Sequence, residues 1–269
     1  MPSVREMGRQ KSRPQTPPDL RATTCISPEL PEKWKSSMLL PELRHQVLAA
    51  NLLLESEGLV KLTWGNVSGI DRASGFFVIK PSGVAYTDLR VQDLVVVDLD
   101  GKVVEGDLNP SSDTPTHRIL YREFPTIGGI CHTHSTHAVM FCQAGLDLPC
   151  HGTTHADHFH GPVPLVRELT EAEVDEDYEA NTGRAIAERF REGGLSPDEM
   201  PAALQRFHAP FTWGKSALDA VKNSVALEVC CQMALGSYAL KPEAPSLPGH
   251  ILRKHYLRKH GPGAYYGQK

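Results

Sequence analysis

Histidine is concentrated in one short stretch, residues 131–137, where His132 and His134 are separated by a single residue. On an extended strand, alternate side chains point to the same face, so both imidazoles would face the same side. Two imidazoles on one face can chelate a divalent cation. A hydrogen-bonded pair of histidines at a strand end is the alternative, and the spacing alone favours it. A metal site therefore requires further ligands from other parts of the chain.

Two other positions supply the ligand types that such a site needs. His208 follows a predicted strand and precedes Pro210, and Asp113 follows two serines at the predicted start of a helix. A carboxylate at that position also has an ordinary structural role, because it can cap the helix N-terminus. Three imidazoles and one carboxylate together would suit zinc, with manganese or cobalt as alternatives.

Two short polar segments, residues 64–68 and 80–83, are predicted to be loops that follow strands. The second contains Lys80 together with serine and glycine, and an amine, a hydroxyl and exposed backbone amides are groups that bind a phosphate monoester. Ser111 and Ser112 add donors at the predicted helix N-terminus, where the helix dipole favours an anion. Ordinary turn composition is the alternative for each segment, and none matches the P-loop pattern.

Segment 152–160 contains His155, Asp157, His158 and His160 within nine residues. Their spacing matches no standard zinc pattern. An acid–base group near the site is therefore a better functional interpretation than a second metal, and a solvated loop is the structural alternative. Further titratable side chains stand near the C-terminus, where most residues are simply exposed.

The elements that must position these groups follow from apolar spacing and breaker residues. Thr170 and Glu173 form a capping box at the start of a long polar helix, and Asp100-Gly101 marks a hairpin. Helices are predicted over 43–54, 111–124, 135–144, 170–193 and 216–236, and strands over 61–62, 76–80, 95–98, 102–105, 130–132 and 203–207. This mixture predicts an α/β fold with a largely antiparallel sheet and flanking helices.

Composition excludes several classes of partner. Of the 269 residues, 40% are hydrophobic and 22% are charged, as in ordinary globular proteins. The formal net charge of -4 argues against nucleic acid or a membrane surface as a partner. No apolar run is long enough to span a bilayer. The six cysteines contain no C-x-x-C pair, which fits a reduced, cytoplasmic setting.

Residues 1–37 differ in composition from the remainder. They contain many prolines, scattered charges and little periodic apolar signal. Such a segment cannot build a core, so we predict a disordered N-terminal extension, followed by one domain over residues 38–269. A translation start at Met38, just before the first helical pattern, is the alternative for this boundary.

A resemblance to a known family connects the separate segments. The chain resembles the L-ribulose-5-phosphate 4-epimerases, which belong to the class II aldolase superfamily. The similar stretches, in matching order and spacing, are LTWGNVS, FVIKPSGV, PSSDTPTHR, HTHS, GTTHAD, KHYLRKHG and AYYGQ. They extend from about residue 43 to residue 268, and several of them are long and specific.

The resemblance implies a three-layer α/β/α fold with a central, mainly antiparallel sheet. It also implies roles for individual residues. The metal ligands would be Asp113, His132, His134 and His208. The phosphate site would contain Asn66, Lys80, Ser82, Gly83, Ser111 and Ser112. The acid–base pair would be Asp157 and Tyr266, with His255 nearby.

The resemblance further implies an activity and an assembly. Family members interconvert L-ribulose 5-phosphate and D-xylulose 5-phosphate with one divalent metal per subunit, by breaking and re-forming the C3–C4 bond. They form four-fold symmetric homotetramers with each site between subunits, so that the acid–base groups come from a neighbour. Both arabinose and ascorbate utilisation use this reaction, and the sequence does not distinguish them.

Two alternatives to the epimerase remain. A class II sugar-phosphate aldolase would share the metal chemistry but release its products, and a glutamate would stand where this chain has Asp113. A non-catalytic, adducin-like scaffold would not need the ligand set. The chain also departs from the family pattern at Ala209, where glycine is usual, and at His158, where an aromatic residue is usual. If position 209 needs a positive φ, alanine would be strained there, and His158 could shift the pKa of Asp157.

Overall fold

The computed structural model describes residues 38–267, and every structural statement below concerns these residues. The predicted disordered extension, residues 1–37, and the last two residues lie outside the described part. Within residues 38–267, no helix is long and apolar enough to cross a membrane.

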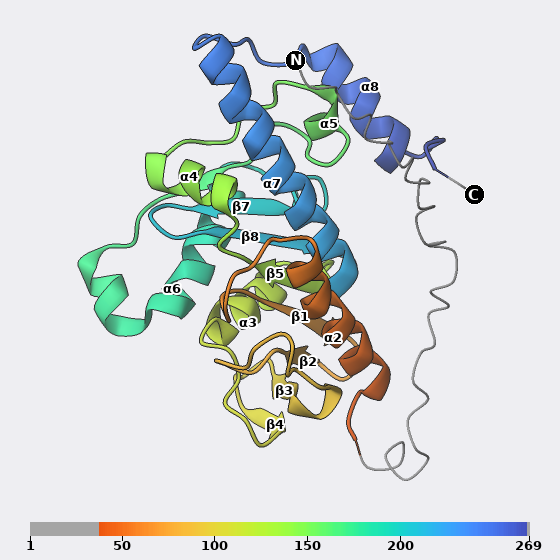
Figure 1. Ribbon diagram of the computed structural model, residues 1–269, viewed down its shortest axis with the longest axis vertical. Helices are drawn as coiled ribbons and strands as arrows, with labels where there is room; N and C mark the ends of the chain where they lie inside the picture. The colour runs from red at the N-terminus through yellow and green to blue at the C-terminus, as the bar shows by residue number, and fades with distance from the viewer. Residues whose placement is uncertain (1–37, 268–269) are drawn as a thin grey trace, which may run out of the picture. The chain divides into compact units, whose positions relative to one another are not determined.

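The centre of the fold is a sheet of eight strands (Figure 1). The strands are β1 (Asn66–Asp71), β2 (Phe76–Ile79), β3 (Val95–Asp98), β4 (Val103–Glu105), β5 (Gly129–His132), β6 (Leu165–Val166), β7 (Ala202–Gln205) and β8 (Pro210–Gly214). Their order in the sheet is β4-β3-β2-β1-β5-β8-β7-β6. All neighbours are antiparallel except β6 and β7, which confirms the predicted, largely antiparallel sheet.

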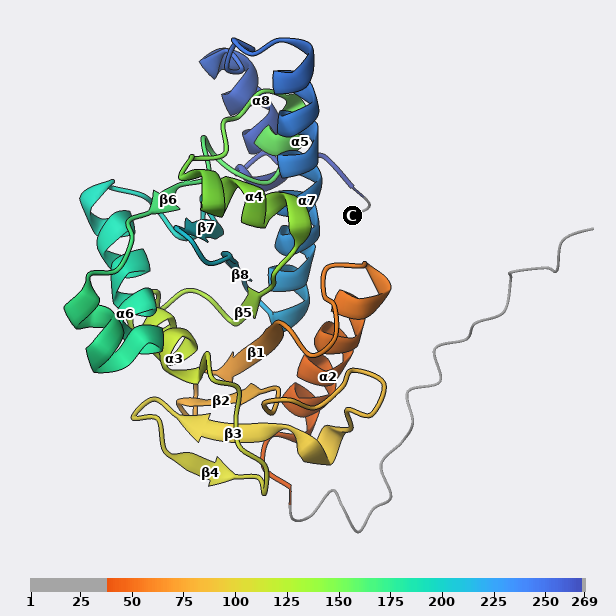
Figure 2. The ribbon, with the colours of Figure 1, turned by 60° about the vertical axis from the view of Figure 1, so that its left-hand side comes forward.

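Helices cover both faces of this sheet. They are α2 (Pro41–Ser56), α3 (Thr114–Glu123), α4 (Thr136–Ala144), α5 (Thr153–Ala156), α6 (Glu171–Glu192), α7 (Ala217–Leu240) and α8 (Gly249–His260), with a short 3-10 helix, η1 (Val91–Asp93). Figure 2 shows α3 and α6 on one side of the sheet and α2 and α7 on the other. This is the three-layer α/β/α arrangement that the sequence predicts.

Two hydrophobic cores result from this layering. Side chains alternate along a strand, so Phe77 and Ile79 of β2 enter the core beneath α3, whereas Val78 enters the core beneath α2. Both faces of the central strands are therefore buried. This explains why Val95–Asp98 begins with a continuous apolar run instead of an apolar–polar alternation.

Local chemistry behaves as predicted at two turns. Gly101 has φ 91° in the turn between β3 and β4, a conformation that suits glycine because it lacks a Cβ. At the start of α6, the Thr170 hydroxyl accepts from the Glu173 backbone amide, and the Glu173 carboxylate accepts from the Thr170 amide. The predicted hairpin and the predicted capping box are both confirmed.

Several element boundaries are corrected. The predicted strand at residues 61–62 is a turn, and the predicted loop at 64–68 instead contains the start of β1. The long helix α7 continues past Gly236 to Leu240. Pattern reasoning missed β8 and α8, since β8 begins with a proline and is buried along nearly its whole length, and α8 has an almost entirely polar sequence.

Candidate active site

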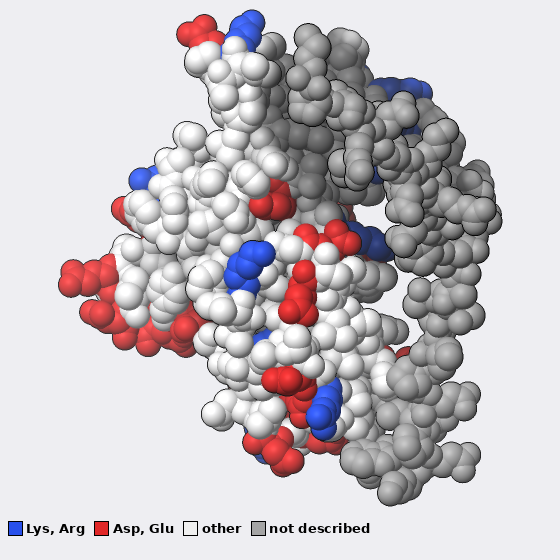
Figure 3. Space-filling view, in the orientation of Figure 1, with Lys and Arg blue, Asp and Glu red and all other residues white. Residues whose placement is uncertain are grey.

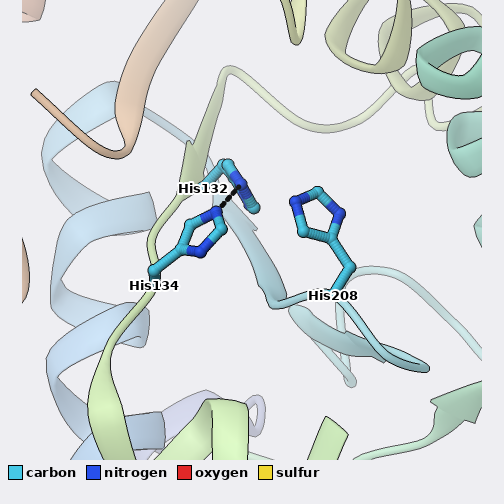
Figure 4. A group of neighbouring side chains, drawn as sticks. All are labelled: His132, His134 and His208. Carbon is cyan, nitrogen blue, oxygen red and sulfur yellow. Dashed lines mark hydrogen bonds between the residues drawn. The ribbon is translucent and has the colours of Figure 1, made fainter. Parts of the chain in front are cut away.

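The three predicted histidine ligands converge on one point. His132 ends β5, His134 lies just before α4, and His208 lies in the turn between β7 and β8. Because β5 and β8 are neighbours in the sheet, this turn lies beside the end of β5. One ring nitrogen from each histidine lies within 4.8 Å of the other two, and Figure 4 shows the rings pointing toward one another.

The rings are held in the form that binds a metal. The His132 Nδ1–H donates to the carbonyl oxygen of Pro210 at 3.0 Å, which leaves the Nε2 lone pair facing the cluster. Burial, followed by the effect of His134, lowers the pKa of His132 to about 3. Burial likewise lowers the pKa of His208 to about 3 and lowers that of His134. Three neutral imidazoles with converging nitrogens fit a divalent cation of the zinc class.

Asp113 stands beside this cluster and not within it. Its Oδ2 lies 3.9 Å from His132 Nε2 and accepts a hydrogen bond from the Asn66 side-chain amide at 2.7 Å. Asp113 does occupy the N-cap position of α3, yet its carboxylate makes no capping hydrogen bond. This corrects the prediction that Ser111 or Ser112 is the N-cap. The carboxylate is therefore directed toward the histidines, and its role as a fourth ligand remains a prediction.

Lys80 provides a buried cation at the end of β2. Its side chain is only 1% exposed, and its ammonium donates a 3.3 Å hydrogen bond to the Pro81 carbonyl. Burial lowers the pKa of Lys80 to about 8. Within residues 38–267 no carboxylate forms an ion pair with this ammonium. A buried, unpaired cation is costly, so the site favours an anionic ligand.

One pocket of about 340 Å³ contains both groups. All ten residues that the sequence assigns to the metal and phosphate sites line it: Asn66, Lys80, Ser82, Gly83, Ser111, Ser112, Asp113, His132, His134 and His208. They lie at the ends of the neighbouring strands β1, β2 and β5, in the turn between β7 and β8, and just before α3. The pocket thus combines a candidate cation site with a candidate anion site.

The predicted acid–base residues do not line this pocket. Asp157, at the end of α5, accepts hydrogen bonds from Arg258 Nη2 at 2.5 Å and from His255 Nδ1 at 3.1 Å. Burial acts to raise the pKa of Asp157, but these hydrogen bonds and the charge of Lys259 hold it below its ordinary value. Tyr266 is 60% exposed, with its ring against Arg258 and Lys259. Asp157 and His255 therefore contact each other, but neither lines the pocket that contains the histidine cluster.

The two departures from the family pattern have different consequences. Ala209 does not have a positive φ, so alanine causes no strain there; within the described residues of this turn, the positive φ of 61° belongs to Phe207. Burial lowers the pKa of His158 to about 4. His158 is therefore neutral at pH 7 and adds no charge beside Asp157.

Sequence reasoning missed Tyr178 and Glu179, which also line the pocket. The helix α6 is broken at Asp177, whose φ and ψ of -167° and 89° are not helical. The Asp177 carboxylate accepts from the Ala180 amide at 3.0 Å, as an N-cap does, so a second helical segment begins there. This break brings the Tyr178 ring to 5.8 Å from that of His208. An aspartate followed by a helical run was the available signal.

The surface around the start of α6 is acidic, as Figure 3 shows. Glu171, Glu173, Asp175, Glu176 and Asp177 all lie in this part of the helix. Such a surface repels anions at long range. An anion would therefore have to be attracted by local groups of the pocket, among which Lys80 is the buried cation.

Comparison with solved structures finds the same fold in L-fuculose 1-phosphate aldolases and in YgbL. An L-fuculose 1-phosphate aldolase is 25% identical, with a TM-score of 0.68 over 80% of this chain and 94% of that chain. YgbL from Klebsiella pneumoniae is 25% identical, with a TM-score of 0.62 over 79% of this chain and 97% of that chain. The L-fuculose-1-phosphate aldolase of Thermus thermophilus is 26% identical, with a TM-score of 0.59 over 76% of this chain and 98% of that chain.

The family match agrees with these likenesses. The profile described as Class II Aldolase and Adducin N-terminal domain matches residues 45–235. This range includes the histidine cluster, Asp113 and Lys80, and it covers most of the chain. By its sequence and its fold, the chain belongs to the class II aldolase and adducin N-terminal domain family.

Proposed function

We propose that the protein is a metal-dependent sugar-phosphate epimerase that interconverts L-ribulose 5-phosphate and D-xylulose 5-phosphate. The observation that carries this proposal is the pairing, in one pocket, of three neutral imidazoles with a buried, unpaired lysine. A phosphorylated ketose has neighbouring carbonyl and hydroxyl oxygens for a cation, and a phosphate for the lysine. The ligand and the pocket are therefore complementary in charge at both ends.

The histidines, with Asp113 as the proposed fourth ligand, would hold one divalent cation, zinc in the first instance and manganese or cobalt as alternatives. When bound, this cation supplies Lewis-acid polarisation of the substrate carbonyl. Asn66 holds the Asp113 carboxylate in place through the 2.7 Å hydrogen bond. Lys80 and the neighbouring hydroxyls and amides would bind the phosphate.

Inversion at C4 needs carbon–carbon cleavage, because the hydrogen on C4 of this ketose is not acidic. A base removes the proton of the C4 hydroxyl, the C3–C4 bond breaks, and its electron pair passes to the ketone fragment. The phosphate-binding residues of the pocket would keep the aldehyde fragment, which turns so that C3 of the ketone fragment attacks its other face and re-forms the C3–C4 bond. An acid on the opposite side then protonates the new C4 alkoxide and so gives the inverted hydroxyl. Asp157 and Tyr266 are the proposed acid–base groups.

These acid–base groups lie apart from the pocket of their own chain, which supports a shared site in a homotetramer. The outer faces of α4 and α7 also leave large apolar side chains exposed, among them Met140, Met233 and Leu240. Apolar exposure of this kind is typical of a subunit interface. The described cysteines are all free and buried, which supports a cytoplasmic setting.

Aldolase activity is the second candidate, since two similar structures are L-fuculose 1-phosphate aldolases. The carboxylate at position 113 favours the epimerase. The short side chain of Asp113 is tied to Asn66 and directed toward His132, an arrangement that suits a ligand better than a mobile base. The retained histidine cluster argues against a non-catalytic scaffold.

Incubating the protein with L-ribulose 5-phosphate and following the sugar by NMR distinguishes the candidates. We expect D-xylulose 5-phosphate to form without accumulation of glycolaldehyde phosphate. Net release of glycolaldehyde phosphate, or cleavage of L-fuculose 1-phosphate at a comparable rate, would establish the aldolase instead. No turnover of either sugar in the presence of zinc, manganese or cobalt would contradict both enzyme proposals.

Replacing Lys80 by methionine should raise the KM for the sugar phosphate by about 10- to 100-fold, the usual cost of losing a charged hydrogen bond. Inorganic sulfate, whose charge is constant near neutrality, tests the same group by calorimetry. Only the ammonium form binds an anion, and the pKa of Lys80 is about 8. Sulfate affinity should therefore be greatest below this pKa and fall as the pH rises through it.

Lys222→Met is the matched control for this test. Lys222 is exposed and paired with Asp219 on α7, outside the pocket. The control should leave both KM and sulfate affinity unchanged. An equal loss in the two variants, or sulfate binding by Lys80→Met with wild-type affinity, would remove Lys80 from the anion site.

A further inference from the structure

The loop of residues 61–65, which contributes Thr63, Trp64 and Gly65 to the pocket wall, has an unusual backbone. Leu62 has φ 53° although it is not glycine, and Gly65 has φ 84°. The Leu62 side chain is 77% exposed, so burial of that side chain does not stabilise the loop. A non-glycine residue in the left-handed region costs free energy. The wall therefore needs an anchor from elsewhere in the fold.

The wall also lies directly against the histidine cluster. A Cβ added to Gly65 would be 2.8 Å from the His132 carbonyl oxygen, closer than a side chain can approach. Thr63, Trp64 and Gly65 themselves line the pocket, and the Trp64 ring lies 6.2 Å from the His134 ring. Any movement of this loop would thus alter the pocket beside the histidines.

Tyr86 supplies the anchor. It is 2% exposed, and its hydroxyl is within hydrogen-bond distance of the Trp64 carbonyl at 2.9 Å and the Gly65 carbonyl at 2.8 Å. Carbonyl oxygens only accept, so the phenol must keep its proton to donate to them. Burial raises the pKa of Tyr86, which agrees with a permanently protonated hydroxyl. Tyr86 is therefore suited to holding the loop and not to proton transfer.

The ring of the same residue faces the candidate phosphate lysine. Lys80 Nζ lies 4.9 Å from the centroid of the Tyr86 ring. An aromatic face at this distance attracts an ammonium group, and the attraction increases when both are shielded from water. Among the described residues 38–267, this ammonium donates a hydrogen bond to the Pro81 carbonyl alone. The ring thus helps to keep a buried lysine charged.

We propose that Tyr86 is a positioning residue that holds the pocket wall with its hydroxyl and the Lys80 ammonium with its ring. The two contacts preorganise the anion site before a ligand binds, because one rigid side chain fixes the positions of both the loop and the Lys80 ammonium. The inference rests on the proposed phosphorylated substrate. Tyr86 touches neither substrate nor metal in this role.

Two substitutions separate the contacts. Tyr86→Phe removes the hydroxyl and keeps the ring, so hydrogen exchange of residues 61–66 should become faster while sulfate affinity stays within about 3-fold of wild type. Tyr86→Leu removes both, so sulfate affinity should fall by about 3- to 30-fold. In Tyr86→Leu the midpoint of the pH dependence should also move to lower pH, because the ammonium is less stable. The other titratable groups of the pocket are unchanged in both variants; they are Asp113, Tyr178, Glu179 and the three histidines.

Tyr121→Phe is the matched control, since Tyr121 is equally buried and its hydroxyl contacts Ser68 at 2.7 Å, away from the wall. The Tyr121→Phe protein should be less stable than the wild type, but hydrogen exchange of residues 61–66 should not become faster. Unchanged exchange of the wall in Tyr86→Phe, or an unchanged pH midpoint for sulfate in Tyr86→Leu, would overturn the inference. Neither measurement uses turnover, so a failed epimerase assay leaves this test intact.

Discussion

Replacing His132 and His134 together by asparagine is expected to remove the bound divalent cation and to abolish turnover. Their Nε2 atoms are 3.2 Å apart, and only His208 and Asp113 would remain as ligands. Wild-type protein should contain about one ion per chain by elemental analysis, and the double variant almost none. Since a Lewis acid contributes several kcal/mol to such a reaction, turnover should fall by at least about 10³-fold.

His137→Asn is a matched control from the same segment. The His137 ring contacts Glu228 at 2.7 Å and does not belong to the cluster. This variant should retain both the metal and most of the activity. Full metal occupancy in the double variant, with a melting curve like that of the wild type, would show that the ion is bound elsewhere.

Tyr266→Phe is expected to reduce turnover by about 10²- to 10⁴-fold, the usual contribution of one acid–base group. The change removes one hydroxyl from a side chain that is 60% exposed, so the fold should be unaffected. KM should change little, because the hydroxyl is proposed to act on the reacting oxygen and not on the phosphate. Equal melting temperatures and a reduced kcat are therefore the predicted signature.

Mixing subunits tests whether Tyr266 acts on a neighbouring pocket. If each site takes Lys80 from one chain and Tyr266 from the next, Tyr266→Phe and Lys80→Met chains complement each other. In a random equal mixture about a quarter of the sites would contain both native residues. At a substrate concentration well below the raised KM of the Lys80→Met protein, activity should then increase after the two impaired proteins exchange subunits.

The control for this experiment is a mixture of Tyr266→Phe chains with Tyr266→Phe, Lys80→Met double-variant chains. Every site in that mixture lacks the tyrosine, so no activity should return. If exchange is demonstrated by mass spectrometry and the complementing mixture shows no gain in activity over the separate proteins, the shared-site proposal fails. Tyr266 would then have to act within its own chain.

The sequence by itself determined the local features of this protein. The hairpin at Asp100-Gly101 and the Thr170 capping box depend on neighbouring residues only, and both lie where predicted. The H-x-H spacing placed two imidazoles on one side at the end of β5. The order of the motifs indicated the class II aldolase superfamily, and the family match over residues 45–235 confirms this coarser assignment.

Only the tertiary structure decided what these groups can do together. His208 joins the other histidines because β8 pairs with β5, which also places the Pro210 carbonyl against the His132 ring, 78 positions away in the chain. Asp113 stands where a cap is expected, but Asn66 draws its carboxylate toward the histidines. The charge state of Lys80 depends on burial, which no spacing reveals. Long-range pairing and desolvation arise from the packed fold as a whole, and so they cannot be read from a local pattern.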